Sequence, residues 1–514
     1  MSQQKGNHRV PVQMLNFENS RTGDLTCSFQ GRYLHSKYNP QNEGEKFAQN
    51  IEADFSPSCL FILEPALSYS APFLKKKFPE AEICAIRFTE AFSKSDSLWD
   101  KVFYLHKNQI PLSEQLFNTF GEEKLCASLS FDWAPSKQVF AEDNMEAWKE
   151  IKTAIIKARN VITTRAYFSK RWLKNALIFV QNVTHTYKIK KGKAPILLTA
   201  SGPSLESSIP FIKAFRDSFF LLAVSSSLMP LVKNNIMPDL VISSDGGYWA
   251  KKHIDLPNLD KEIPFALECE SAVPKKILHE KKIIPLAYED GIGKGLLDKT
   301  GCPYTLSQRN GTVAGTALEL ALNLTSGNIY ICGLDQAPSP AFQHTQPNAL
   351  ENDNAKKDFR LRNKETRVTK SRFNSENALE IYRNWFITNS DYFSKRVFRL
   401  SDNFSYSFSL GKISEVNWQY FENLEKTSDI EKTAIIKADF KINQQERLEK
   451  IQGKLESMSK TEEFKNEVFP MDTILLKREL AEDKKIMLKE AIEKKITELL
   501  SSLRTGMENQ AEIK

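Results

Sequence analysis

The sequence predicts an α/β protein with a central Rossmann-like, doubly wound and mostly parallel sheet, an N-terminal α/β domain and a helical C-terminal region. The main observation is the alternation of short apolar runs with helix-like patterns between residues 195 and 335. Such alternation is typical of a parallel sheet that is covered by helices on both faces. A similar alternation fills residues 1 to about 140, and residues from about 425 onward are rich in Lys, Glu, Leu and Ile at helical spacing.

These patterns divide the 514 residues into four parts. Residues 143–190 contain no Pro or Gly and carry apolar residues at a spacing of three and four, which predicts a long helix or a helix pair. We therefore expect an N-terminal α/β domain (1–142), this helical connector, a central Rossmann-like domain (191–415) and a helical C-terminal region (416–514).

Individual elements follow from local periodicity. In the N-terminal domain, "CLFILEPALSYSAPFLKKKFP" followed by "AEICAIRF" predicts a strand, a helix and a second strand. Its first turn has no glycine, so we do not expect a dinucleotide there. The polar, basic stretch 351–372 is interpreted as a loop. In the central domain we expect strands at 195–200, 218–225, 238–244, 282–287 and 327–332, and helices at 205–215, 227–235 and 312–324.

The overall composition narrows the class of protein. Hydrophobic residues make up 41% and charged residues 26% of the chain, which is a globular balance, and a net charge of +7 does not call for nucleic acid as a partner. The seven cysteines are scattered without CxxC spacing, which favours a reducing compartment. The first residues carry no apolar signal segment, and no run of ~18 apolar residues predicts a membrane span. The expected location is the cytoplasm.

The first motif is "PILLTASGPSLESS" at 195–208, where a buried strand ends in small polar residues before a helix. Gly202 and Pro203 lie between Ser201 and Ser204. Free amides and the macrodipole at such a helix start favour an anion, so a phosphate is the expected ligand. The alternative is an ordinary capped turn.

The second motif is "PDLVISSDGGYW", which places Asp245 just beyond the carboxyl end of a strand, where open α/β sheets bind ligands. Asp245 is a candidate for binding a ribose hydroxyl, a metal or a substrate hydroxyl, or it forms an Asx turn. The third motif is "SQRNGTVAGTALELALNL", in which Asn310, Gly311 and Thr312 open an Ala-rich helix and offer a second anion or base-edge site; capping alone is the alternative.

The fourth motif is "NIYICGLDQAPSPAFQHTQ", where a strand ends at Gly333 and the following loop carries Asp335 and His344. A histidine in such a loop can act as a general base near neutral pH, or it is an ordinary surface histidine. The basic residues of 356–372 either hold an anion or are solvated. There is no HExxH and no metal-spaced histidine pair, and no DxD beside the sheet, so we expect no metal.

Taken in order, "ASGPSL", "PDLVISSDGG", "RNGTVAGTALELA" and "IYICGLDQA…H", with "GRYLHSKYNPQNEGEKF" near the N-terminus, resemble the motility-associated factor (Maf) glycosyltransferases. The resemblance covers roughly residues 25 to 415. Its central motifs are shared with pterin diphosphokinase (MptE-like) relatives and, more distantly, with bacterial sialyltransferases.

The resemblance implies transfer of a nonulosonic, sialic-acid-like sugar from its CMP-activated form to Ser or Thr hydroxyls of flagellin, with inversion and without a cofactor. His344 is the first candidate for the base and Asp245 the second. The residues expected at the nucleotide and donor sugar are Ser201, Gly202, Pro203, Ser204, Ser225, Ser226, Asn310, Gly311, Thr312, Gly333 and Asp335. Two alternatives stay open: a nucleotide-dependent diphosphokinase-like enzyme on the same fold, and a non-catalytic binding protein of the flagellar system. The sequence says nothing about the oligomeric state.

Overall fold

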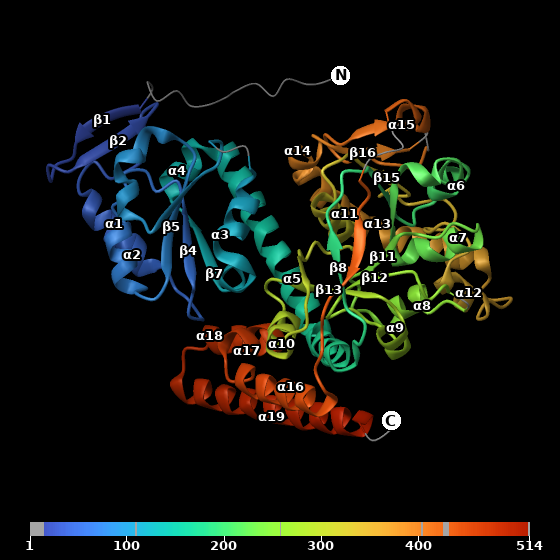
Figure 1. The fold of residues 1–514 in the computed structure, drawn as a ribbon. Coiled ribbons are helices and arrows are strands. Elements are labelled where there is room, and N and C mark those ends of the chain that lie inside the picture. The colour runs from blue at the N-terminus through green and yellow to red at the C-terminus, as the bar shows by residue number, and fades with distance from the viewer. Residues whose placement is uncertain (1–14, 108–109, 258, 402–404, 425–430, 512–514) are drawn as a thin grey trace. The chain divides into compact units, whose positions relative to one another are not determined.

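The computed structural model describes residues 15–107, 110–257, 259–401, 405–424 and 431–511 (Figure 1). The N-terminal stretch in which no signal segment was expected lies outside these residues. The chain forms two compact units. The first comprises Met1–Tyr167 and Lys465–Leu499, and the second comprises Phe168–Phe464 and Leu500–Lys514. The C-terminal region therefore contributes to both units, and the four-part division stays a prediction.

The first unit contains a parallel sheet of four strands within the described residues. The sheet order is β6 (Lys101–Tyr104), β5 (Glu82–Arg87), β4 (Cys59–Leu63) and β7 (Ser128–Asp132). The strand–helix–strand unit predicted here is confirmed as β4, α2 (Ala71–Lys77) and β5, and β4 and β5 are parallel. An antiparallel sheet joins β1 (Leu15–Asn19), β2 (Leu25–Phe29) and β3 (Arg32–Tyr33). The helical elements of this unit are α1 (Pro40–Asn50), η2 (Glu90–Leu98), α3 (Leu112–Cys126), α4 (Ala134–Val139) and α18 (Pro470–Arg478).

The second unit is built on a sheet of nine parallel strands within the described residues. Across the sheet the order is β14 (Thr305–Ser307), β13 (Ile283–Tyr288), β12 (Phe265–Glu268), β11 (Leu240–Ser243), β10 (Phe220–Val224), β9 (Ile196–Thr199), β15 (Ile329–Cys332), β16 (Val397–Leu400) and β17 (Ser414–Val416). The five predicted strands are all present, and β12, β14, β16 and β17 are additions that the sequence patterns did not reveal.

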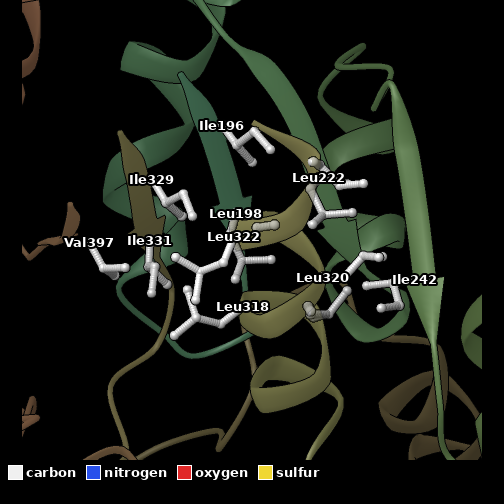
Figure 2. Packing of buried hydrophobic residues seen from close by; sticks show 14 of the residues in the cluster. Ile196, Leu198, Leu222, Ile242, Leu318, Leu320, Leu322, Ile329, Ile331 and Val397 are labelled. Carbon is white, nitrogen blue, oxygen red and sulfur yellow. The ribbon is translucent and has the colours of Figure 1, made fainter. Parts of the chain in front are cut away.

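The sheet is doubly wound, as predicted, because buried side chains on its two faces pack against different helices. Alternate residues of β9 point to opposite faces: Ile196 and Leu198 join a core formed with α11 (Val313–Leu324), whereas Leu197 joins a core formed with α6 (Leu205–Ala214). Figure 2 shows Leu318, Leu320 and Leu322 of α11 packed among the residues of β9, β10, β11 and β15. Each fully buried Leu or Ile stabilises the fold by roughly 1.5–3 kcal/mol.

The order of the strands creates a topological switch point between β9 and β15. From β9 the chain winds through β10 to β14 on one side, and it then returns to the other side of β9 to form β15, β16 and β17. The loops that leave the carboxyl ends of β9 and β15 therefore run in opposite directions. In open α/β sheets this divergence leaves the crevice in which ligands bind.

The stretch 351–372 was predicted to be a loop, and this was wrong. It consists largely of α12 (Ala349–Ala355) and the beginning of α13 (Lys364–Thr388). Each helix is capped by an asparagine, because Asn348 accepts a bond from the amide of Leu350 and Asn363 from that of Thr366. Capping and ion pairs, and not an apolar stripe, therefore specify these helices.

The long helix expected after residue 143 is confirmed as α5 (Ala141–Asn182). The end of that stretch is instead strand β8 (Tyr187–Lys190), which pairs with β18 (Ala434–Lys437). The remaining helical elements are η3 (Arg216–Ser218), η4 (Ser225–Ser227), α7 (Leu228–Lys233), η5 (Tyr248–Ala250), α8 (Lys251–Ile254), α9 (Lys275–Glu280), α10 (Ile292–Thr300), α14 (Ser390–Phe393), α15 (Trp418–Leu424), α16 (Gln444–Met458), α17 (Glu462–Val468) and α19 (Glu482–Ala511). Within the described residues, no helix is long and apolar enough to cross a membrane.

Candidate functional site at the switch point

The loops that follow β9 and β15 meet at the switch point through a hydrogen bond between Ser201 and His344. The Ser201 hydroxyl lies 3.0 Å from Nδ1 of His344, although 143 residues separate the two in the chain. The amide of Thr345 donates to the carbonyl of Ser201 at 2.8 Å, and its hydroxyl donates to the carbonyl of Gly202 at 2.6 Å. The loops that carry the first and fourth motifs thus meet in the structure.

The loop after β10 reaches the same place. Ser226, in η4, donates a hydrogen bond from its hydroxyl to the hydroxyl of Ser201 at 2.8 Å. Its neighbour Ser225 is buried. A chain of three polar side chains therefore runs from Ser226 through Ser201 to His344, across the carboxyl ends of three adjacent strands.

The helix start at α6 is filled by a side chain of the protein itself. The amide of Ser204 donates to Oδ2 of Asp335 at 2.9 Å, and the Ser204 hydroxyl donates to Oδ1. The amide of Gly202 is also engaged, because it donates to the carbonyl of Gly333 at 2.6 Å. The amides of Gly202 and Ser204, which were expected to hold a phosphate, are therefore engaged within the protein, and the carboxyl group of Asp335 occupies this helix end.

Glycine is required at position 202 for a steric reason. A Cβ added there would lie 2.5 Å from Oδ2 of Asp335 and 2.6 Å from the carbonyl oxygen of Gly333. Gly333 itself has a φ of +71° and would place a Cβ 2.3 Å from the carbonyl oxygen of Ala200. Both glycines thus let two loops approach closely, and Pro203 lies in the turn between them and the helix.

Burial changes the proton affinity of Asp335. The side chain is buried, and burial raises the pKa of its carboxyl group, while the two bonds from Ser204 and the charge of Arg399 act in the opposite direction. Arg399 is 2% exposed and donates to the carbonyls of Leu334 and Phe408. Asp335 is therefore part of the framework that holds the loop, and its oxygens are occupied.

His344 is held neutral by its surroundings. The residue is exposed to solvent, and partial desolvation by the neighbouring protein atoms lowers the pKa of its imidazole, against a smaller opposite effect from hydrogen bonding to Ser201. A neutral imidazole has a free lone pair on one nitrogen and so can accept a proton.

A second histidine accompanies His344, and the sequence analysis missed it. His253, in α8, is buried, and burial together with the charge of a protonated His344 lowers its pKa to about 4. Its local sequence, "WAKKHIDL", is typical of an exposed basic turn. Only the fold, which places α8 beside η4 and α12, brings this side chain towards the site.

Asp245 lies at the carboxyl end of β11, as predicted, and forms an Asx turn. Its Oδ1 accepts the amide of Gly247 at 2.7 Å, and its side chain is exposed. β11 is two strands away from β9, or about 10 Å across the sheet. Among the described residues, Asp245 has no interaction with Ser201 or His344, so its expected role as second candidate for the base has no support from this geometry.

Asn310, Gly311 and Thr312 lie at the beginning of α11. Thr312 is the N-cap and accepts the amide of Gly315 at 2.9 Å, while Gly311 has a φ of +72°. The amides of Val313 and Ala314 have no partner within the described part of the chain. Because α11 packs against β9, β10 and β11 and follows a strand of a parallel sheet, its N-terminus lies at the carboxyl edge. This helix start, unlike that of α6, is open to an anion.

A buried acidic pair follows β12 and was also missed by the sequence analysis. Glu268 is fully buried, and burial and the neighbouring charge of Glu270 raise its pKa. Glu270 pairs with Arg309 at 3.0 Å. The Arg309 guanidinium lies 4.9 Å from the ring of Trp172 and 4.5 Å from the ring of Tyr288. No group of three or more potential metal ligands occurs among the described residues.

The basic stretch has structural partners. Arg367 pairs with Glu351 through two bonds of 2.7 and 2.6 Å and with Asp358 through two bonds of 2.8 Å. Its guanidinium is therefore not available to a ligand anion. The side chain of Arg372, the last of the basic series, lies outside the described residues.

The central domain matches a model of a known protein family. Residues 170–340 match the family model described as 6-hydroxymethylpterin diphosphokinase MptE-like. This segment contains β9 to β15 and the switch point, but ends just before His344.

The fold is similar to that of a Maf glycosyltransferase. The chain matches the structure of the Maf glycosyltransferase from Magnetospirillum magneticum AMB-1 with a TM-score of 0.52 and 12% sequence identity, over 96% of this chain and 92% of that one. The resemblance to the Maf and MptE-like proteins seen in the sequence is thus confirmed by the domain match and the shared fold.

Two proteins of Treponema pallidum (strain Nichols), both described as uncharacterized, are similar in sequence. One is 32% identical over 273 residues, which is 53% of this chain and 59% of the relative. The other is 20% identical over 363 residues, which is 66% of this chain and 61% of the relative. The chain thus spans about six tenths of the length of these relatives.

Proposed function

We propose that this chain is a glycosyltransferase that moves a nonulosonic, sialic-acid-like sugar from a CMP-activated donor to Ser or Thr hydroxyls of flagellin in the cytoplasm. The observation that carries the proposal is the Ser226–Ser201–His344 chain at the switch point of a Maf-like fold. The crevice is where this sheet topology binds ligands, and His344 gives it a neutral base.

The donor phosphate is assigned to the N-terminus of α11. The amides of Gly202 and Ser204 are used internally, whereas those of Val313 and Ala314 are free of partners in the described part of the chain. They and the helix macrodipole stabilise the charge that grows on the phosphate of CMP as it leaves. The hydroxyls of Ser201 and Ser226 supply neutral contacts nearer the base. We propose that no metal is needed, which predicts that transfer is insensitive to EDTA.

His344 is assigned the role of general base. Since Nδ1 is the ring nitrogen that faces Ser201, we assign the proton to Nδ1 and the free lone pair to Nε2. Nε2 takes the proton of the acceptor hydroxyl, the hydroxyl oxygen bonds to the anomeric carbon, and the bond from that carbon to the phosphate oxygen of CMP breaks.

A ligand-binding experiment tests the nucleotide class. CMP and CDP are expected to raise the melting temperature of the purified chain in a thermal-shift titration, because binding to the folded state stabilises it. The second candidate, a diphosphokinase, is favoured by the description of the family that matches 170–340. Stabilisation by ATP and a hydroxymethylpterin but not by CMP would contradict the transferase and support the diphosphokinase.

A further inference from the structure

A pocket of about 180 Å³ lies beside His344, on the side formed by α12 and α13. Its walls come from one continuous stretch of chain, 341–371, and include Phe342, His344, Asn348, Glu351 and Arg367. We call it the His344 pocket. It is smaller than the roughly 300–1,000 Å³ of pockets that enclose a drug-sized ligand, so it does not hold a complete nucleotide sugar.

The two charged side chains that line the His344 pocket besides the imidazole, Glu351 and Arg367, form an ion pair with each other. Arg367, its cationic side chain, makes two bonds each to the carboxylates of Glu351 and Asp358. The lowered pKa of His344 keeps the imidazole uncharged near neutral pH. A phosphate or a carboxylate in the pocket would therefore lose its hydration without finding a counterion, which is costly. The pocket favours an uncharged ligand.

Asn348 provides a donor that has no acceptor. The residue is 2% exposed and lines the pocket, and its Oδ1 is used to cap α12 through the amide of Leu350 at 3.0 Å. Its Nδ2 has no hydrogen-bond partner within the described part of the chain. A buried donor without a partner is destabilising, so such a group usually marks a missing partner. The partner required here is an oxygen that accepts.

The position of the proposed base, His344, indicates which of the two substrates binds in the His344 pocket. A general base must lie within hydrogen-bond reach of the proton that it removes, and the proton in question belongs to the acceptor hydroxyl. The hydroxyl-bearing substrate must therefore occupy the space that His344 lines. A peptide segment is uncharged, small in cross-section and rich in carbonyl oxygens, and it meets each of these conditions.

We propose that the His344 pocket is the acceptor subsite, and that Nδ2 of Asn348 donates to a main-chain carbonyl of the peptide that carries the reactive Ser or Thr. This inference rests on the proposed function, because it uses His344 as the base. Asn348 acts as a binding residue that positions the peptide.

The chain offers a matched pair of variants for the test. Asn348→Asp keeps an oxygen that can cap α12 and removes the NH₂ donor. Asn363→Asp makes the same change at the exposed cap of α13, where Oδ1 accepts the amide of Thr366 at 2.9 Å and the residue does not line the pocket. Asn348→Ser is an uncharged second variant that keeps a capping oxygen and removes Nδ2, in case Asn348→Asp does not fold.

Ligand-observed NMR titration measures binding of three probes to each protein: the blocked peptide acetyl-Gly-Ser-Gly-amide, methyl α-glucopyranoside and inorganic phosphate. The peptide is expected to bind the wild type and Asn363→Asp equally, and about tenfold or more weakly to Asn348→Asp and Asn348→Ser. Equal peptide binding by all four proteins, or binding of the glucoside or of phosphate that Asn348→Asp weakens, would overturn the proposal.

Titration of CMP into the same four proteins separates the two proposals. All four should bind CMP alike if the nucleotide lies at α11. If the peptide result holds and CMP binds none of them, the transferase is contradicted while the peptide pocket stands. If CMP binds and the peptide does not discriminate Asn348→Asp, the acceptor subsite fails and the transferase is unaffected.

Discussion

The buried carboxyl group of Asp335 at the start of α6 gives the sharpest structural prediction. Asp335→Ala removes the acceptor of both the Ser204 amide and the Ser204 hydroxyl, and Ser204 is only 2% exposed. Two buried donors without partners cost about 1–3 kcal/mol each, so we expect the second unit to lose about 2–6 kcal/mol of unfolding free energy. Asp335→Asn keeps one acceptor and is expected to lose less.

The pH dependence of this effect has a definite sign. Burial raises the pKa of Asp335, so the folded state holds the proton more tightly than the unfolded chain does. The stabilisation from this group is complete below the unfolded pKa and is lost as the pH rises through the folded pKa. Asparagine imitates the protonated side chain, so the advantage of the wild type over Asp335→Asn should shrink as the pH rises above the ordinary carboxyl pKa of 3.8.

The assay is urea unfolding followed by circular dichroism, combined with hydrogen exchange of peptides that cover 201–215. Asp217→Asn, an exposed change two residues beyond the cap of α6, serves as the control. Our reasoning is refuted if Asp335→Ala unfolds at the same urea concentration as Asp217→Asn. An advantage over Asp335→Asn that grows with pH would refute the assigned sign.

Two further predictions concern packing and titration. Gly202→Ala places a methyl group 2.5–2.6 Å from Asp335 and Gly333, so this variant should have a markedly lower melting temperature. The control is Gly453→Ala, in the exposed interior of α16 with no heavy atom within 4 Å, which should raise stability by about 0.5–1 kcal/mol. Equal melting temperatures for the two variants would contradict the close approach of the loops at Gly202. His253→Gln removes a group whose pKa falls from 6.5 to about 4 on folding, so between those pH values the wild type should lose up to about 2–3 kcal/mol of unfolding free energy that the variant keeps. Unfolding free energy is measured by urea titration of both proteins at pH 7 and at pH 5. An equal decrease for the two proteins would show that His253 does not titrate in this way.

Strong local patterns in the sequence predicted the central strands of the large parallel sheet. The apolar runs that became β9, β10 and β15 are buried on both faces, and such runs stand out in any sequence. β12 was missed because "FALECESAV" contains two glutamates, and a buried Glu268 is tolerated only through partners that the fold supplies. The stretch 351–372 was misjudged because its helices depend on caps and ion pairs, while polar residues in a row look like a loop.

The sequence predicted several residues of the candidate site, but not the hydrogen bonds between them. Sequence motifs placed Ser201, Asp335 and His344 beyond the carboxyl ends of strands, and in the structure Ser201 bonds to His344 while Asp335 bonds to Ser204. Asp335 occupies the helix start at which a phosphate was expected. Its contact with Ser204 joins residues 131 apart in the chain, which local patterns do not reveal. The same holds for His253 and for Asn348, whose unpartnered amide becomes visible only when every neighbouring group is in place.

The most direct test of the proposed chemistry is transfer by the purified chain. Flagellin is incubated with a CMP-activated nonulosonic acid and its intact mass is measured, with wild-type protein, with His344→Ala and with His106→Ala, a histidine of the first unit. We predict that the wild type and His106→Ala add the mass of the sugar, and that His344→Ala binds CMP but adds none. Transfer at the wild-type rate by His344→Ala would contradict the assignment of the base, and no added mass with any of the three proteins would contradict the transferase itself.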